Sequence, residues 1–207
     1  MVRRQVRSAL FTGLALTGSL GALAAAGPQA ARPLGIDTAR VTIAGTSNIH
    51  VYTASTTTVH VTRAALAGDV AGPEFWAAIL KPGAVEAFEV AIPAAQLSSP
   101  KEGLDKNMHK ALKVQEHADI TFRLLRLEPG EAGALKAHGV LRIAGVERNV
   151  ALDLTTERQG TNLGVKGKVD LLMTDYGVKP PTAMLGMLKT DPKVTVTFET
   201  VLSVPLT

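Results

Sequence analysis

The feature that most constrains the fold is an alternation of apolar and polar residues with period two, which begins near Val41 and continues almost to the end of the chain. In the run "VALDLTTE", Val150, Leu152 and Leu154 fall on one face of an extended chain, and Asp153 falls on the other. The runs "LGVKGKVDLLM" and "KVTVTFETVLSV" repeat this scheme. Such alternation is typical of antiparallel sheets with one face against an apolar interior and one face in water. The sequence therefore predicts an all-β protein.

The strands are long and closely spaced. Eight are predicted, at residues 41–52, 57–66, 84–93, 118–128, 133–144, 148–157, 163–174 and 193–205. Several reach about ten residues, which is longer than the usual five or six. A change of phase at Leu124 and Leu125 predicts a β-bulge. Gly145 indicates a tight hairpin turn, and Gly160 indicates a looser one.

Eight long antiparallel strands with one apolar face can close into a barrel or pack as a two-sheet sandwich. An eight-stranded barrel has an interior that side chains fill, or that holds one small ligand. The inward positions here are mostly Val, Leu and Ile, and aromatic residues make up only 4% of the chain. Medium-sized aliphatic side chains in a tall barrel leave room for a long, narrow void.

Two or three segments between the strands favour helix. In "SSPKEGLDKNMHKALK", Ser99 is the expected N-cap with Glu102 three residues later, and Leu104, Met108 and Leu112 share one face. We expect this helix to lie on the side of the sheet. A shorter segment, "PEFWAAILK", is expected to form a small apolar plug.

The segment "PPTAMLGMLK" is expected to form a short apolar capping helix that begins at the tandem prolines. One interpretation is an ordinary helix that fills the end of a barrel. Another is a lid that contacts a ligand, because flexible, polarizable methionine suits a surface that fits mobile apolar molecules. The two interpretations are compatible, and we expect the segment to do both.

The first 26 of the 207 residues have the composition of a signal peptide. A cationic start, "MVRRQVR", precedes an apolar run that ends in small residues, and we expect cleavage after Ala26, with Ala24 as the alternative. An uncleaved anchor is the competing interpretation. Residues 27–39 are expected to be a flexible segment and residues 40–207 a single domain, located in the periplasm or secreted.

Charge and composition exclude several functional classes. The chain has 22 Lys and Arg against 18 Asp and Glu, and loss of the three arginines before Ala26 leaves 19 against 18, a net charge of +1. That balance gives no reason to expect a nucleic-acid partner. There is no cysteine, and the five histidines are scattered without metal-ligand spacing. No nucleophile elbow, phosphate-binding loop or dinucleotide motif is present, so we expect neither an enzyme nor a metal protein.

Three blocks of the sequence are similar to a known family. The blocks "GLDKNMHKALKVQEHADITF", "GVLRIAGVERNVALDL" and "MTDYGVKPPTAMLGMLKTDPKVTVTF" resemble the YceI-like family of bacterial exported polyisoprenoid-binding proteins, in the same order and spacing. The likeness extends over roughly residues 40–205. Two departures are Val51-Tyr52, where many relatives carry an acidic residue and a tryptophan, and Tyr176, where phenylalanine is usual.

The resemblance implies a lipocalin-like, eight-stranded antiparallel barrel with one side helix, which binds a long isoprenoid chain in its lumen. The implied role is carriage or storage of a polyisoprenoid or isoprenoid quinone, with no cofactor other than this lipid. We also expect transient contact with a membrane, and a monomer or homodimer. The alternatives are a ligand-free barrel that acts as a stress-related structural or interaction protein, and an enzyme that acts on an isoprenoid.

The residues expected to contact the lipid are the large apolar side chains of the inner face and of the capping segment. They are Phe88, Val90, Phe122, Ile143, Leu152, Leu171, Met173, Tyr176, Met184, Leu185, Leu188 and Phe198. Tyr176 is the candidate for a hydroxyl that meets the lipid head group at the mouth of the barrel. An ordinary core tyrosine is the alternative.

Overall fold

Antiparallel strands form where the alternation predicts them. The structure, a computed structural model, describes residues 34–68, 72–131, 134–183 and 187–204. The strands are β1 (Gly35–Ser47), β2 (Val51–Thr56), β3 (His60–Leu66), β4 (Val85–Pro93), β5 (Asp119–Pro129), β6 (Leu135–Ile143), β7 (Val146–Gln159), β8 (Asn162–Leu172), β9 (Thr182–Ala183) and β10 (Leu188–Ser203). The helices are α1 (Phe75–Ile79) and α2 (Glu102–Ala111), with 3₁₀ turns at Ala94–Gln96 and Met173–Tyr176.

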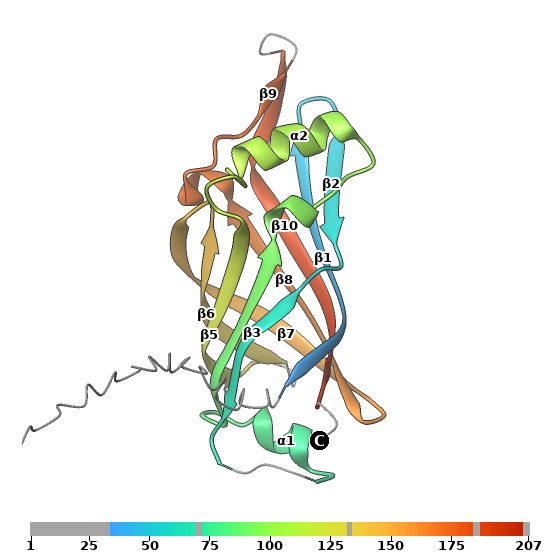
Figure 1. Cartoon of the computed structure of the whole chain (residues 1–207), viewed down its shortest axis with the longest axis vertical. Helices are drawn as coiled ribbons and strands as arrows, with labels where there is room; N and C mark the ends of the chain where they lie inside the picture. Colours follow the sequence, from blue (N-terminus) through green and yellow to red (C-terminus); the bar gives the residue numbers. More distant parts are fainter. Residues whose placement is uncertain (1–33, 69–71, 132–133, 184–186, 205–207) are drawn as a thin grey trace, which may run out of the picture. The chain divides into compact units, whose positions relative to one another are not determined.

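The order of the strands forces the sheet to close on itself. That order is β2-β1-β10-β8-β7-β6-β5-β4-β3, and short β9 pairs with β10 alone. The strands at the two ends of this order, β2 and β3, are joined only by Thr57–Val59. A connection of three residues reaches about 10 Å at most, so the opposite edges of the sheet must meet. The sheet therefore curls into a barrel (Figure 1).

The closure uses a different contact on each side of this connection. On the β2 side, Ser55 N donates to Ser98 O at 2.8 Å, and Ser98 N donates to Ser55 O at 3.0 Å. This backbone pair joins the outer edge of β2 to the chain that follows β4. On the other side, β3 is hydrogen-bonded in the strand order to β4, and β1 is not its neighbour. There β1 and β3 contact each other without forming a ladder of hydrogen bonds. The lipocalin-like barrel expected from the sequence is thus confirmed.

The predicted strand count of eight is too low. The predicted strand 41–52 is two strands, because the chain turns at residues 48–50 between β1 and β2. Ser47 Oγ makes this turn by accepting the backbone N–H groups of Ile49 and His50 at 3.3 and 3.1 Å. β1 also begins at Gly35, so the last part of the segment expected to be flexible, residues 27–39, is strand. The predicted signal peptide lies outside the described residues.

The predicted bulge and hairpin are confirmed. The pairing of β5 with β6 shifts between Leu124 and Arg126. The β6–β7 turn is closed by the pair Ile143 and Val146, with Ala144 at φ 48° and Gly145 at φ 82° between them. Positive φ at both central residues is the geometry of the tight hairpin turn that matches the twist of the strands.

The helix α2 lies on the side of the barrel, but it begins later than expected. Ser99 is not its N-cap; Ser99 N instead donates to Asp105 Oδ1 at 2.7 Å, and its Oγ accepts the N–H of Lys101 at 3.1 Å. The partly buried side chains of Met108 and Leu112 pack against the core, as the spacing predicts. The predicted plug is α1, in which Phe75, Trp76 and Ile79 are buried.

The predicted capping helix is wrong for the part of the segment that the structure describes. Thr182 and Ala183 form β9 and pair with Lys189 and Leu188 of β10. Thr190 N also donates to Pro181 O at 3.2 Å, which continues the contact between the two arms. The tandem prolines favour an extended chain rather than a helix here, because proline disfavours the helical region for the residue before it. The described residues on the two sides of this segment are therefore paired as antiparallel strands.

The core has a closed group of side chains near each end of the barrel. At one end, Leu34 and Leu163 pack with α1. At the other end, one cluster surrounds Tyr176 and Val178, and another surrounds Leu97, which is only 1% exposed. A further buried cluster, of Ala137, Leu152 and Leu154, lies on β6 and β7.

We expect Leu97→Ala to lower the free energy of unfolding by about 2–5 kcal/mol, because it removes a fully buried side chain and leaves a cavity. Urea denaturation followed by the fluorescence of Trp76, the single tryptophan, measures this change. The matched control is Leu125→Ala, because Leu125 is 49% exposed and its loss should cost less than about 0.5 kcal/mol. Equal effects of the two substitutions would contradict this assignment of the core.

Candidate functional site

An apolar cavity of about 220 Å³ lies inside the barrel. Its walls come from β1, β4, β5, β6, β7, β8 and β10, so nearly the whole circumference contributes. Within the described residues, the lining side chains are hydrocarbon except for Thr156 and Thr200. No charged side chain of the described residues lines it. We call this space the lumen.

The period-two pattern produces the apolar lining directly. On β8, Val165, Val169 and Leu171 face the lumen, and on neighbouring β10, Val196 and Phe198 do so. The residues between them point outward, because successive side chains of a strand alternate between its two faces. The chain thereby places one continuous apolar surface inside the barrel.

The outward positions carry the charges. Lys193 Nζ lies 2.8 Å from Asp170 Oδ2, and Thr195 Oγ1 donates to Asp170 Oδ1 at 2.6 Å. The hydrogen bonds from Lys193 and from Thr195 hold the pKa of the Asp170 carboxyl below its usual value. Lys136 and Asp153 form a similar pair at 3.0 Å between β6 and β7. These pairs are exposed to solvent and leave the inner face free of charge.

Two glycines on the inner face make room for aromatic rings. Phe198 is paired with Gly167 across β10 and β8, and a Cβ built on Gly167 would collide with the Phe198 ring. A Cβ built on Gly139 would likewise collide with the ring of Phe122. Both rings can therefore lie along the wall instead of standing in the lumen. The prediction from sequence missed these glycines, although glycine inside a strand pattern signals close approach.

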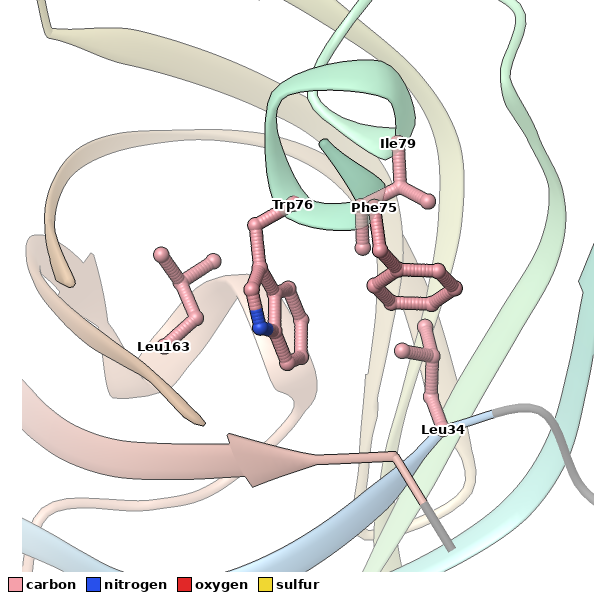
Figure 2. Close-up of a cluster of buried hydrophobic side chains, with 5 residues drawn as sticks. All are labelled: Leu34, Phe75, Trp76, Ile79 and Leu163. Carbon is pink, nitrogen blue, oxygen red and sulfur yellow. The ribbon is translucent and has the colours of Figure 1, made fainter. Parts of the chain in front are cut away.

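The helix α1 closes one end of the lumen. Figure 2 shows its side chains, with Trp76 beside Leu163 and the ring of Phe75 next to Leu34. The two aromatic rings meet edge to face, with centroids 5.1 Å apart and planes at 87°. Trp76 Nε1 donates to Thr161 O at 2.8 Å, which joins α1 to the β7–β8 turn. Ile79 of α1 lines the cavity directly.

The opposite end is closed by the cluster around Tyr176. This side chain is 3% exposed and packs with Leu171, Val178 and Val194. Burial raises the pKa of the Tyr176 hydroxyl, and the neighbouring Asp175 raises it further. Ile143 and Met173 pack against the same cluster.

The structure places the predicted contact residues in three groups. One group lines the lumen: Phe88, Val90, Phe122, Leu152, Leu171 and Phe198. A second group packs at the closed end instead of lining the lumen: Ile143, Met173 and Tyr176. Met184 and Leu185 lie outside the described residues, as does the side chain of Leu188.

Two further observations help to identify the candidate site. Among the described residues, no group of three or more His, Asp or Glu side chains is placed to hold a metal ion. A second hollow of about 180 Å³ lies where outward side chains such as Glu89, Arg123 and Arg142 meet. Opposite charges are paired across neighbouring strands there, Glu89 with Arg123 and Arg142 with Glu147, which is the arrangement of a solvated sheet surface. The lumen is therefore the candidate site, and it fits an apolar ligand.

Comparison with known proteins identifies a family with this architecture. The family model of the YceI-like domain matches residues 35–202 of the chain. The comparison with curated proteins gives no match.

Solved structures with the same fold have low sequence identity to the chain. A polyisoprenoid-binding domain from Saccharophagus degradans, described as implicated in plant cell wall breakdown, has a TM-score of 0.63 at 13% identity and covers 84% of this chain and 99% of its own. BcnA from Burkholderia cenocepacia has a TM-score of 0.60 at 13% identity, with 80% and 96% covered. The YceI protein of Campylobacter jejuni has a TM-score of 0.52 at 16% identity, with 72% and 85% covered. These likenesses show the fold, and the family match extends over nearly all of the barrel. The chain belongs to the YceI-like family.

Proposed function

We propose that this protein binds a long isoprenoid lipid in the lumen of its barrel and carries or stores it outside the cytoplasm. The observation that carries the proposal is the lumen itself, a space inside the barrel whose described lining is hydrocarbon apart from two threonines. The similar structure from Saccharophagus degradans is described as a polyisoprenoid-binding domain, which supports the same class of ligand.

The energetics favour such a ligand. Moving apolar surface out of water contributes about 0.8 kcal/mol per buried CH₂, so each five-carbon isoprene unit adds about 3–4 kcal/mol before the cost of ordering the chain. A long isoprenoid is nearly insoluble in water for the same reason. An apolar lumen with a charged exterior allows it to cross an aqueous compartment.

The size of the lumen sets a condition on binding. A cavity of about 220 Å³ is smaller than the roughly 300–1,000 Å³ of typical small-molecule sites. A long chain must therefore enlarge it by moving side chains or an end closure. The plug α1 is the natural part to move, because it is only five residues long and one side-chain hydrogen bond, from Trp76, joins it to the β7–β8 turn.

Export and the absence of catalysis are parts of the same proposal. Residues 1–26 have the composition of a signal peptide, which supports a periplasmic or secreted location. No described helix combines the length and the apolar character needed to span a bilayer. The lining of the lumen, as far as the structure describes it, offers no carboxylate, histidine or lysine to act as an acid or base.

We further propose that one end of the barrel touches the membrane. Ile49, Val51 and Met187 are 61%, 67% and 68% exposed. They lie on the β1–β2 and β9–β10 hairpins, which Asn48 joins: its Nδ2 donates to Met187 O at 2.8 Å, and its Oδ1 accepts Lys189 N at 2.9 Å.

Several backbone groups in the described part of this tip have hydrogen-bond partners within the protein. Besides the bonds of Asn48, Ser47 N and Ser47 Oγ both donate to His50 O at 2.9 Å. These groups therefore keep their partners when the tip is dehydrated, and the exposed Lys189 lies beside it to meet anionic lipid. A lipid carrier needs such a contact, because its ligand comes from a bilayer.

Native mass spectrometry of the mature protein, purified without detergent and then extracted with organic solvent, tests the main proposal. We expect a stoichiometric adduct whose components differ by isoprene units. A bare mass that persists after incubation with isoprenoids would overturn the proposal and favour the ligand-free interaction protein.

Leu171→Glu should abolish retention of the lipid, because it places a carboxylate in a lumen without a cationic partner. Leu172→Glu is the matched control, since Leu172 is the next residue on β8 and is 43% exposed. Circular dichroism establishes that both variants are folded. Full lipid occupancy in folded Leu171→Glu would show that the ligand lies elsewhere.

Gly167→Val should reduce lipid occupancy about tenfold, because a side chain there pushes the ring of Phe198 into the lumen. The fold-change corresponds to about 1.4 kcal/mol of binding free energy. The control is Lys168→Val, an exposed neighbour on the same strand. Unchanged occupancy in Gly167→Val would mean that the width of the lumen at this level does not limit binding.

The tip is tested by co-sedimentation with vesicles of equal parts phosphatidylcholine and phosphatidylglycerol. We expect the double variant Ile49→Ser, Met187→Ser to bind at least about tenfold more weakly, because each substitution removes one apolar side chain from the interface. Leu125→Ser replaces an exposed leucine of β5 and should leave binding unchanged. Equal loss in both would indicate a nonspecific apolar surface rather than a docking tip.

A further inference from the structure

The two hydroxyl groups of the lumen lie at one level of the barrel. Thr156 of β7 is paired with Val165 of β8, and Thr200 of β10 is paired with the same Val165 from the other side. Directly paired residues share a face, so all three side chains point inward, as the lining of the cavity requires. Strands are spaced about 4.8 Å apart, so the two threonine Cα atoms are about 10 Å apart across Val165.

Both hydroxyls are available to a ligand. No side-chain hydrogen bond joins either of them to another described residue. Among the described residues, no side-chain oxygen is both fully buried and without a partner. The two oxygens are therefore accessible from the lumen, in a wall that otherwise offers no hydrogen-bonding side chain.

This polar level lies toward the plugged end. Val165 packs against the cluster formed by Leu34, Leu163 and the residues of α1, and so does Leu202, two residues beyond Thr200 on β10. The lumen continues in the opposite direction past Val169 and Leu171, where the described lining is hydrocarbon. The lumen thus has one polar level near its plugged end, and its described walls are hydrocarbon toward the other end.

We propose that Thr156 and Thr200 form the head-group site for the isoprenoid, and that the bound lipid has an uncharged head group with oxygen that accepts hydrogen bonds. This inference rests on the proposed function. An alcohol or a quinone carbonyl fits, because either threonine hydroxyl can donate one hydrogen bond to its oxygen. The tail then extends from the plugged end toward Leu171.

A charged head group does not fit this level. A phosphate in the lumen would lose its hydration, and no lysine or arginine of the described residues lines the cavity to compensate. Two neutral hydroxyls supply hydrogen bonds but no charge. The lining therefore selects the neutral lipid over its phosphate ester.

The test compares three ligands with one tail: a polyprenol, the hydrocarbon of the same length without the hydroxyl, and the polyprenyl monophosphate. Each is partitioned between the protein and phosphatidylcholine vesicles, and the lipid retained by the protein is measured. We expect the wild-type protein to bind the alcohol about tenfold more tightly than the hydrocarbon, and also more tightly than the phosphate.

The double variant Thr156→Val, Thr200→Val keeps the shape of the side chains and removes both hydroxyls. It should bind the alcohol and the hydrocarbon equally, with affinity for the hydrocarbon unchanged or increased. The control is Thr155→Val, Thr197→Val, which changes exposed threonines on the same two strands and should preserve the preference for the alcohol.

Three outcomes would overturn the inference. Equal binding of alcohol and hydrocarbon by the wild-type protein, tighter binding of the phosphate, or a preference that survives in the inner double variant would each overturn the head-group site alone. Failure of the wild-type protein to bind any of the three ligands would overturn the proposed function as well, so the two failures are distinguishable.

Discussion

The structure depends on the short connection between β2 and β3. Thr57–Val59 joins the two strands that stand at opposite ends of the sheet order, so the sheet cannot lie open. Once its edges meet, every inward side chain faces another across a shared interior. The pairing of β1 with β10 then links the two ends of the barrel sequence along eleven paired positions, from Gly35 with Ser203 to Ser47 with Thr190. Closure of the sheet therefore places its apolar face on the inside of a barrel.

The kind of ligand that the lumen can hold follows from the side chains that line it and from those that pack at its two ends. Aliphatic side chains and three phenylalanines, two of whose rings lie along the wall, surround a void, whereas α1 and the Tyr176 cluster pack at the two ends. The glycines opposite the rings are as important as the rings, because a side chain at Gly139 or Gly167 would occupy the same space. No charged side chain of the described residues lines the lumen. Such an interior suits a long apolar molecule and gives little support to acid–base chemistry.

Of the apolar residues that first suggested a lid, Met187 has a different setting in the structure. The described parts of the segment 180–190 form a hairpin, and its exposed Met187 stands next to the β1–β2 turn. Among the described residues, α1 packs at one end of the lumen and residues such as Tyr176 pack at the other. An apolar hairpin that projects from the barrel is better suited to meet a bilayer than to cover a lumen, and this is why we assign it to membrane contact.

The sequence by itself determined the class of fold, most strand positions, the bulge near Leu124, the turn at Gly145 and which side chains face inward. These follow from local rules, since alternation with period two and the φ angles of turn residues need no distant partner. Only the tertiary structure decided the level at which each inward residue sits along the barrel. Alternation is the same for Leu171, which lines the void, and Met173, which packs at the closed end. The same holds for Thr156 and Thr200, which are 44 positions apart in the numbering and meet only because the register places both beside Val165. Register is set by pairing between strands that are distant in the sequence. The level of a residue along the barrel therefore cannot be read from its own strand alone.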